Sequence, residues 1–203
     1  MKSEPISTWA LKEVADGQMR LVLAEMEQDP KTVLPYRYFL EAMEVIHPQD
    51  GIAILDVGCG CGHYGRLVSQ FYPKLGYCGT DFSEYMVANA RLICPNGAFW
   101  KNEFFDNPFH SFDIVLTSST MEYTRDPFEA LRAVLTGFKQ YAILHRMRLT
   151  DGPSEHFDEP TYAGYTAPHF KWNRAEVEGW LKSFDHITMD WKEGEYSTVI
   201  AWK

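Results

Sequence analysis

Long apolar runs are missing from this chain of 203 residues, although 45% of its residues are hydrophobic and 15% are aromatic. No stretch reaches the roughly 18 uninterrupted apolar residues that a membrane-spanning helix needs. The first residues, MKSEPISTW, also lack the apolar core of a secretory signal peptide. We therefore expect a cytoplasmic protein with no membrane partner, whose apolar residues build one core within a single domain over residues 1–203.

Positive charge is scarce. The chain has 19 Lys and Arg against 28 Asp and Glu, which gives a formal net charge of -9 at pH 7. Proteins that bind the phosphate backbone of nucleic acids draw their affinity from clustered Lys and Arg. This charge balance argues against a nucleic-acid partner and favours a small molecule as the partner.

Cysteine is scarce as well, with four residues in the chain. Cys59 and Cys61 lie close together in sequence, but no second pair of Cys or His residues at ligand spacing completes a four-ligand metal site. The sequence therefore predicts no metal. We interpret the cysteines as small reduced residues that fill tightly packed places.

Internal repeats and low-complexity tracts are absent from the sequence, so its organisation is inferred from hydrophobic periodicity. Residues 7–28, with Ser7 or Thr8 as cap, and residues 36–46 have helical spacing and predict an N-terminal helical cap over residues 1–50. Short apolar runs then alternate with helical patterns. The predicted strands are residues 52–57, 76–80, 98–101, 112–117 and 141–145, and the predicted helices between them are residues 64–71, 84–93 and 127–138.

The end of the chain has a different pattern. A helix is predicted over residues 173–183, followed by strands over 186–191 and 196–202 that four residues join. Four residues are too few for a parallel crossover, so the two strands must form an antiparallel hairpin. Alternation of strands and helices before it predicts a parallel sheet covered on both faces. We therefore expect an α/β fold over residues 51–203. Its predicted helix N-caps are Ser83, Asp126 and Asn173.

A glycine-rich stretch, ILDVGCGCGHYGRLV, directly follows the first predicted parallel strand and opens a helix. Glycines at such a position let the backbone turn sharply and approach a bound ligand closely. Gly60, Gly62 and Gly65 also fit the G-x-G-x-x-G pattern of dinucleotide sites. The glycines alone therefore do not choose the ligand.

Three carboxylates at successive strand ends are more informative. Asp56 precedes the glycines, where it would repel a pyrophosphate anion and suits a ligand with positive charge. Asp81 follows the second strand and is placed to accept hydrogen bonds from two ribose hydroxyls. Glu103 follows the third strand and is placed to accept from the exocyclic amine of an adenine ring. Each acid alone has an ordinary structural explanation, but together they predict a cationic adenosine ligand.

Residues 52–138 resemble the class I S-adenosylmethionine-dependent methyltransferases, in particular the small branch called methyltransferase type 11/25. The stretches ILDVGCGCG, GTDFSEYMVANAR and FDIVLTSSTMEYTRDPFEALRAV look like successive motifs of that family. The resemblance implies a Rossmann-like three-layer sandwich, with a seven-stranded mostly parallel sheet that ends in an antiparallel hairpin. It also implies S-adenosyl-L-methionine as the cofactor and S-adenosyl-L-homocysteine as the product.

Carried over by position, the resemblance also implies the cofactor contacts. They are Asp56, Gly58, Cys59, Gly60, Ser118 and Ser119 at the methionine end, Asp81 at the ribose, and Phe82, Met86, Glu103 and Phe104 around the adenine. The same resemblance implies that Glu122 pairs within the fold. The family often has an aromatic or small apolar residue where Ser119 stands and a histidine where Tyr123 stands, and these departures concern the acceptor side.

Residues 146–172 are too many for an ordinary connection, and they leave the predicted sheet at its ligand-binding edge. We expect this insertion to be a lid over the acceptor, with Tyr162 and Tyr165 as aromatic walls. A base is needed only for a protonated acceptor, since methyl transfer otherwise depends on positioning. The candidate bases are His145, His156, His169 and Tyr123, and the candidates for contacting the cofactor carboxylate or the acceptor are Tyr36 and Arg37. Structural roles are more common for all six.

The leading prediction is a methyltransferase that acts on a small-molecule acceptor by O- or N-methylation. The alternative is a catalytically silent S-adenosylmethionine-binding or interaction module of the same fold, because the sequence TSST stands where an acceptor motif such as Asn-Pro-Pro-Tyr would follow the fourth strand. A nicotinamide-dependent oxidoreductase is opposed by Asp56 and by the terminal hairpin.

Overall fold

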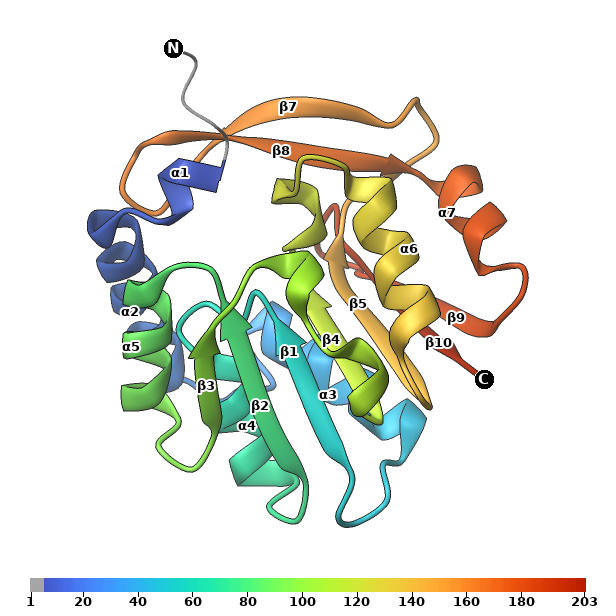
Figure 1. The fold of residues 1–203 in the computed structure, drawn as a ribbon. Coiled ribbons are helices and arrows are strands. Elements are labelled where there is room, and N and C mark those ends of the chain that lie inside the picture. The colour runs from blue at the N-terminus through green and yellow to red at the C-terminus, as the bar shows by residue number, and fades with distance from the viewer. Residues whose placement is uncertain (1–5) are drawn as a thin grey trace.

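A seven-stranded sheet forms the centre of the computed structural model, which describes residues 6–203 (Figure 1). The strand order is β3-β2-β1-β4-β5-β10-β9, in which the first five strands are parallel and the β10 strand is antiparallel to both of its neighbours. The strands are β1 (Ala53–Val57), β2 (Gly76–Asp81), β3 (Ala98–Lys101), β4 (Ile114–Ser118), β5 (Tyr141–Met147), β9 (Asp185–Asp190) and β10 (Ser197–Trp202). The predicted mostly parallel sheet with a terminal antiparallel hairpin is confirmed.

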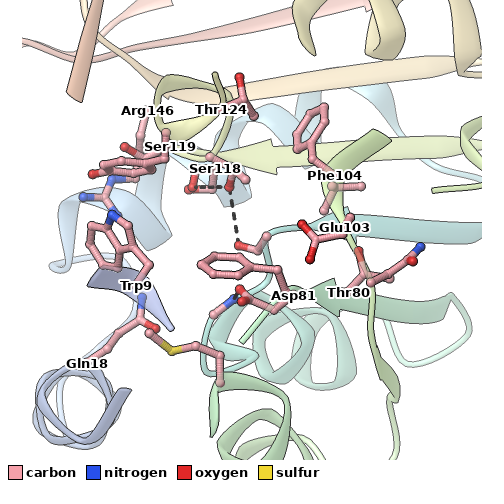
Figure 2. A pocket seen from close by; sticks show the side chains of 18 of the residues that line it. Trp9, Gln18, Thr80, Asp81, Glu103, Phe104, Ser118, Ser119, Thr124 and Arg146 are labelled. Atoms are coloured by element: carbon pink, nitrogen blue, oxygen red, sulfur yellow. Dashed lines mark hydrogen bonds between the residues drawn. The ribbon is translucent and has the colours of Figure 1, made fainter. Parts of the chain in front are cut away.

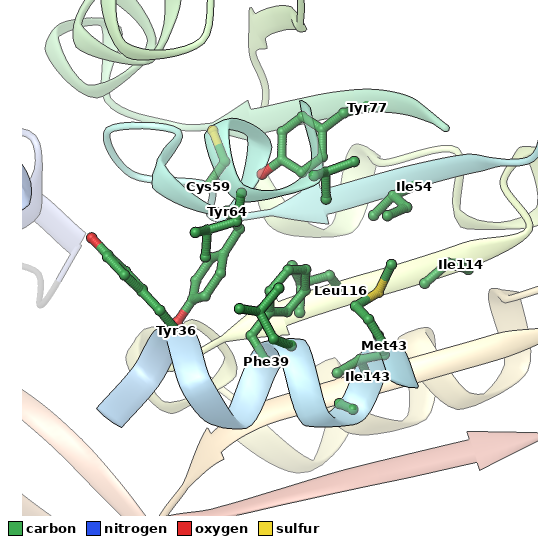
Figure 3. Close-up of a cluster of buried hydrophobic side chains, with 14 of the residues drawn as sticks. Tyr36, Phe39, Met43, Ile54, Cys59, Tyr64, Tyr77, Ile114, Leu116 and Ile143 are labelled. Carbon is green, nitrogen blue, oxygen red and sulfur yellow. The ribbon is translucent and has the colours of Figure 1, made fainter. Parts of the chain in front are cut away.

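Helices cover both faces of this sheet because successive strand residues point to opposite sides. Along β4, Ile114 and Leu116 join the cluster under α3, whereas Val115 joins the cluster under α6. In Figure 3, Phe39 and Met43 of α3 pack over strand residues of the first cluster. The helices of the first face are α3 (Leu34–Ile46), α4 (His63–Phe71) and α5 (Glu84–Ile93), and those of the second are α6 (Pro127–Gly137) and α7 (Arg174–Leu181). Within residues 6–203, no helix has the length and apolar character required to cross a bilayer.

The three helix N-caps expected from the sequence are present. The Ser83 hydroxyl accepts from the Met86 N–H at 3.4 Å, and a carboxylate oxygen of Asp126 accepts from the Glu129 N–H at 3.0 Å. The Asn173 side chain accepts from the Glu176 N–H at 2.9 Å. Each of these bonds satisfies a backbone donor that the helix leaves free at its first turn.

The helix predicted over residues 7–28 is wrong in one respect, since it is two helices. The α1 helix (Ile6–Trp9) and the α2 helix (Lys12–Met26) are separated by Leu11, which has an extended backbone with ψ of 138° and no side-chain cap. The break brings the Trp9 ring to 4.7 Å from the Tyr123 ring. Thr8 therefore does not cap α2, and the Ser7 side chain lies outside the described part of the chain, as do residues 1–5.

The insertion at residues 146–172 contains strands that the sequence analysis missed. They are β6 (Leu149–Thr150), β7 (Glu155–Pro160) and β8 (Thr166–Asn173), and they form a second sheet in the order β6-β8-β7. The β7 and β8 strands are antiparallel and arch over the C-terminal ends of the parallel strands (Figure 1). Trp172 of β8 is fully buried, and its indole N–H donates to the Glu122 carboxylate at 3.2 Å. The bond agrees with the expected structural role of Glu122.

Candidate active site

A cavity lies at the C-terminal ends of the parallel strands, where ligands bind in open α/β sheets (Figure 2). Each of the five parallel strands contributes to its lining a residue at its C-terminal end or within two residues of that end. These residues are Gly58 after β1, Asp81 in β2, Glu103 after β3, Ser118 in β4 and Arg146 in β5. Another part of the wall comes from Trp9 and Gln18 of the N-terminal helices and from Tyr162 at the tip of the β7–β8 hairpin.

Most of the residues predicted to contact a cofactor reach this wall. Those that line the cavity are Gly58, Gly60, Asp81, Phe82, Met86, Glu103, Phe104, Ser118 and Ser119. Asp56 and Cys59 are not among the lining residues, and both are buried. Cys59 belongs to the cluster under α3. The structure thus brings Asp81 and Glu103 together at the cavity, whereas Asp56 lies outside it.

Asp81 is held in place by backbone donors. One carboxylate oxygen accepts from the Gly60 N–H at 3.0 Å, and the other accepts from the Ser83 N–H at 2.9 Å. Burial raises the pKa of Asp81 to about 6, against the effect of these two hydrogen bonds. A carboxylate has about four lone-pair sites. Asp81 therefore ties the glycine loop to the end of β2 and keeps acceptor capacity toward the cavity.

The glycine loop is covered by the protein itself. Gly58 and Gly60 have φ of 75° and 52°, a conformation that favours glycine. A Cβ at Gly58 would collide with the Thr120 side chain, and one at Gly60 would lie 2.6 Å from the Gln18 amide oxygen. A Cβ at Gly17 would lie 2.8 Å from the Tyr162 carbonyl oxygen. These close approaches seat α2 against both the loop and the tip of the hairpin.

The prediction that Asp56 faces a cationic ligand is wrong in its geometry. Asp56 points to the α3 side of the sheet, where its carboxylate accepts a hydrogen bond from the Tyr77 hydroxyl. Burial raises the pKa of Asp56 to about 7, although the bond from Tyr77 opposes this shift. Asp56 is therefore a buried core residue beneath the loop. It does not face a ligand, so the argument that it would repel the pyrophosphate of a dinucleotide is wrong as well.

The raised pKa makes stability depend on pH. Because the pKa of Asp56 rises from its ordinary 3.8 to about 7, the folded state keeps a proton that the unfolded chain releases. The stability gained from this proton is fully present below about pH 4 and is lost as the pH rises through about 7. Asp56→Asn keeps an oxygen for Tyr77 and carries no charge. We expect urea denaturation to show that its stability relative to wild type improves by about 1–3 kcal/mol between pH 5 and pH 8.

The exposed Asp50→Asn serves as the control for this comparison and should show no such change. An Asp56→Asn variant whose stability relative to wild type is the same at pH 5 and pH 8 would contradict the assignment of a raised pKa.

Two of the candidate bases lie off the cavity wall. His145 is buried, its Nε2–H donates to the Pro35 carbonyl at 3.0 Å, and its Nδ1 accepts from the Thr198 hydroxyl at 2.8 Å. Burial lowers its pKa well below the usual value. His156 is exposed, with its ring 4.8 Å from that of Phe170. Neither histidine lines the cavity, so both are structural or surface residues in this fold.

The other two candidates are connected to the cavity. Tyr123 lines it, and His169 lies directly behind the wall with its Nε2 at 3.4 Å from the Ser119 hydroxyl. The His169 ring is 4.8 Å from the Tyr123 ring, and burial lowers the pKa of His169 to about 4. A neutral His169 whose Nδ1–H donates to the Phe170 carbonyl at 3.3 Å presents the Nε2 lone pair to Ser119.

Of the four other residues predicted to contact the acceptor or the cofactor carboxylate, one lines the cavity and three do not. Tyr162 lines the cavity, whereas Tyr165 is exposed at the hairpin tip. The Tyr36 hydroxyl donates to Glu25 at 2.7 Å, and Arg37 pairs with Glu193 at 2.7 Å. Tyr36 and Arg37 do not line the cavity.

Several lining residues were missed by the sequence analysis, and they carry unsatisfied polar groups. Within residues 6–203, nine buried side-chain nitrogen and oxygen atoms have no hydrogen-bond partner. Five of them belong to residues of the cavity wall, namely Trp9 Nε1, Gln18 Oε1, His63 Nδ1, Thr80 Oγ1 and Arg146 Nε. Buried polar groups are normally paired, so this concentration marks the cavity as a place for a polar ligand. For Thr80 and Arg146, the only sequence signal of a place at the cavity was their position near the ends of predicted strands.

A family model described as a methyltransferase domain matches residues 55–144, which run from β1 through β5. The chain contains a methyltransferase domain over these residues. The matched segment contains the glycine loop after β1 and Asp81 at the end of β2. It also runs through the strands that form the parallel part of the sheet, from β1 to β5. The family resemblance inferred from the sequence motifs is thereby confirmed.

Curated relatives of the methyltransferase domain match over a shorter stretch. A trans-aconitate 2-methyltransferase of Escherichia coli O1:K1 / APEC is 29% identical over 77 residues, which are 37% of this chain and 31% of that protein. The match thus spans about a third of the length of the curated relative.

Solved structures share the fold over most of this chain. An amino pentose methyltransferase from Micromonospora echinaspora with bound S-adenosylmethionine has a TM-score of 0.65 at 13% identity, covering 91% of this chain and 96% of that one. The magnesium protoporphyrin IX methyltransferase from Synechocystis PCC 6803 with bound S-adenosylhomocysteine has a TM-score of 0.62 at 13% identity, covering 95% and 86%.

Proposed function

We propose that this protein transfers a methyl group from S-adenosylmethionine to a small-molecule acceptor. The observation that carries the proposal is Asp81, a cavity carboxylate that the Gly60 and Ser83 N–H groups hold in place and that keeps acceptor capacity for two ribose hydroxyls. Glu103 lines the same side of the cavity. Bound S-adenosylmethionine or its product in the solved relatives supports the choice of ligand.

The walls around these acids fit an adenosine group. Phe82, Met86 and Phe104 supply apolar surface beside Asp81 and Glu103. Apolar walls with a few convergent polar groups are typical of cofactor sites. The unpaired Gln18 and Thr80 oxygens supply additional acceptors, which suits the ammonium and hydroxyl groups of the proposed cofactor.

When bound, S-adenosylmethionine supplies a sulfonium methyl group that a nucleophile displaces in line. The residues of this chain contribute mainly by positioning, because the neutral leaving group needs no acid. Ser118 is fixed by a hydrogen bond of 3.0 Å with the Tyr64 hydroxyl, and Ser119 lies next to it on the wall. Trp9, Tyr123 and Tyr162 enclose this side with aromatic rings, which limits the access of water.

An acceptor hydroxyl or amine must also lose a proton. We propose that Ser119 and His169 take it, since the Ser119 hydroxyl lies on the wall and contacts the free lone pair of His169 Nε2. Ser119 would receive the proton of the acceptor while its own proton moves to His169. A carboxylate acceptor would not need this step. The acceptor is a small molecule in this proposal, as it is for the trans-aconitate, amino pentose and magnesium protoporphyrin IX methyltransferases.

The experiment that tests the proposal combines binding with turnover. We expect calorimetry to detect binding of S-adenosylhomocysteine and no binding of NAD, because the solved structures with this fold hold S-adenosylmethionine or its product. Radiolabelled S-adenosylmethionine should then label a compound in a metabolite extract, in a fraction that boiled protein leaves unlabelled. NAD binding without binding of S-adenosylhomocysteine would contradict the proposed cofactor. Cofactor binding without any labelled product, with trans-aconitate among the compounds offered, would identify a silent binding module.

A further inference from the structure

Two residues at the ends of neighbouring strands adopt the left-handed backbone conformation. Ser119, directly after β4, has φ of 51°, and Arg146 in β5 has φ of 58°. They are linked, since the Ser119 N–H donates to the His145 carbonyl at 3.0 Å. Among residues 6–203, the other non-glycine residue with positive φ is His47, which ends α3 in an ordinary helix cap. The left-handed conformation is unfavourable for residues with a Cβ, and it gathers at functional sites.

Arg146 occupies a β-bulge. The β10–β5 ladder pairs Val199 with Leu144 and Ser197 with Met147, so two steps along β10 face three steps along β5. Such a bulge turns a side chain away from the direction that strand alternation would give it. Here the turned side chain is Arg146, which lines the cavity.

The guanidinium of Arg146 forms no salt bridge within residues 6–203, and the buried Glu122 carboxylate acts on it only by longer-range attraction. Its Nε is buried without a hydrogen-bond acceptor, and its guanidinium carbon lies 5.4 Å from the centre of the Tyr196 ring. Arg148, two residues later, bonds to Glu159 at 2.7 Å and to the Tyr196 hydroxyl at 2.9 Å. Buried charges are normally paired, and carboxylates outnumber cations in this chain. An unpaired arginine on the wall is therefore a site for an anion from outside the chain.

The position of Arg146 separates it from the proposed adenosine site. Figure 2 shows Arg146 beside Ser119 and Trp9, across the cavity from Glu103 and Phe104. We propose that Arg146 binds a carboxylate group of the methyl acceptor, an inference that rests on the proposed function. The planar fork of a guanidinium matches a carboxylate with two parallel hydrogen bonds. The acceptor class is thus a small organic acid, held under the tip of the β7–β8 hairpin.

The first test uses the wild-type protein saturated with S-adenosylhomocysteine, which fills the cofactor's own carboxylate position. Thermal shifts are compared for succinate, benzoate and trans-aconitate and for the corresponding amides. We expect at least one acid to raise the melting temperature while its amide does not. Equal shifts for every acid and its amide, or no shift at all, would overturn the inference. Failure to bind S-adenosylhomocysteine would instead overturn the proposed function.

The second test assigns the acid to Arg146. Arg146→Met removes the charge at similar length, and Arg146→Gly removes it while accepting the positive φ, so the pair covers a variant that folds poorly. We expect either variant to lower the affinity for the preferred acid by roughly 10- to 100-fold, the range for hydrogen bonds to a charged group, with partial recovery in Arg146→Lys. The exposed Arg132→Met controls for the loss of one positive charge and should bind the acid normally.

The same variants distinguish the acceptor from the cofactor as the source of the carboxylate. We expect their affinity for S-adenosylhomocysteine to stay within about threefold of wild type, as for a residue outside the cofactor site. A loss of S-adenosylhomocysteine affinity with unchanged affinity for methylthioadenosine, which lacks the amino acid group, would show that Arg146 binds the cofactor carboxylate. That result would overturn the assignment to the acceptor.

Discussion

Replacement of Asp81 by Ala is expected to weaken the binding of S-adenosylhomocysteine by about 2–4 kcal/mol, which corresponds to roughly 30- to 1000-fold in affinity. The substitution removes the acceptor proposed for two ribose hydroxyls. It also frees the Gly60 N–H, so the glycine loop loses its link to the end of β2. Calorimetry of the folded variant measures the loss, and urea denaturation measures the accompanying loss of stability.

Ser83→Ala is the matched control for this variant. It removes the hydroxyl that accepts from the Met86 N–H at the start of α5, but it leaves the carboxylate in place. Loss of such a cap lowers stability by about 1 kcal/mol. Ser83→Ala should therefore be less stable than wild type and bind S-adenosylhomocysteine normally. An Asp81→Ala protein whose folded fraction keeps wild-type affinity would reduce Asp81 to a structural residue.

Shortening the tip of the β7–β8 hairpin is expected to abolish methyl transfer while sparing the cofactor. Pro160 pairs with Thr166 in the ladder, so residues 161–165 form the loop, and an Asn-Gly turn is a suitable two-residue replacement. The change keeps both strands and removes Tyr162 from the cavity wall. Turnover should fall by at least about 100-fold, since positioning supplies much of the rate in this reaction. Affinity for S-adenosylhomocysteine should change by less than about threefold, because the proposed cofactor acids lie on other elements.

Tyr165→Ala is the control within the same loop. Tyr165 is exposed and does not line the cavity, so its removal should leave turnover unchanged. Wild-type turnover in the shortened variant would show that the hairpin tip does not shape the acceptor site. The acceptor would then have to be sought on the side of Trp9 and Gln18.

Local patterns predicted the parts of the fold that depend on local interactions. Ser83, Asp126 and Asn173 were recognisable as caps because each bonds to a backbone group only three residues away. The alternation of β1 and β4 predicted buried strands, but the pattern did not reveal which side of the sheet each residue faces. Asp56 was therefore placed at the cavity, whereas the sheet directs it toward Tyr77.

The missed features depend on partners that are distant in sequence. The β7 strand reads EHFDEP, whose charges and proline hide a strand that exists because β8 pairs with it. Trp9 and Gln18 reach the cavity because α1 and α2 are separate helices, of which α1 packs against Tyr123 and Tyr162 and α2 against the glycine loop. The bulge at Arg146 follows from a register mismatch with β10, which neither strand shows alone.

The left-handed conformations of Ser119 and Arg146 have a practical consequence for anyone who engineers this protein. Glycine accepts such a backbone without the steric penalty that a Cβ brings. A directed-evolution screen that rewards thermal tolerance alone should therefore enrich glycine at both positions. Each gain in stability would weaken the proposed acceptor site, because the same substitutions delete a hydroxyl and a guanidinium from the cavity wall. A screen for a more thermostable variant should therefore leave Ser119 and Arg146 unchanged.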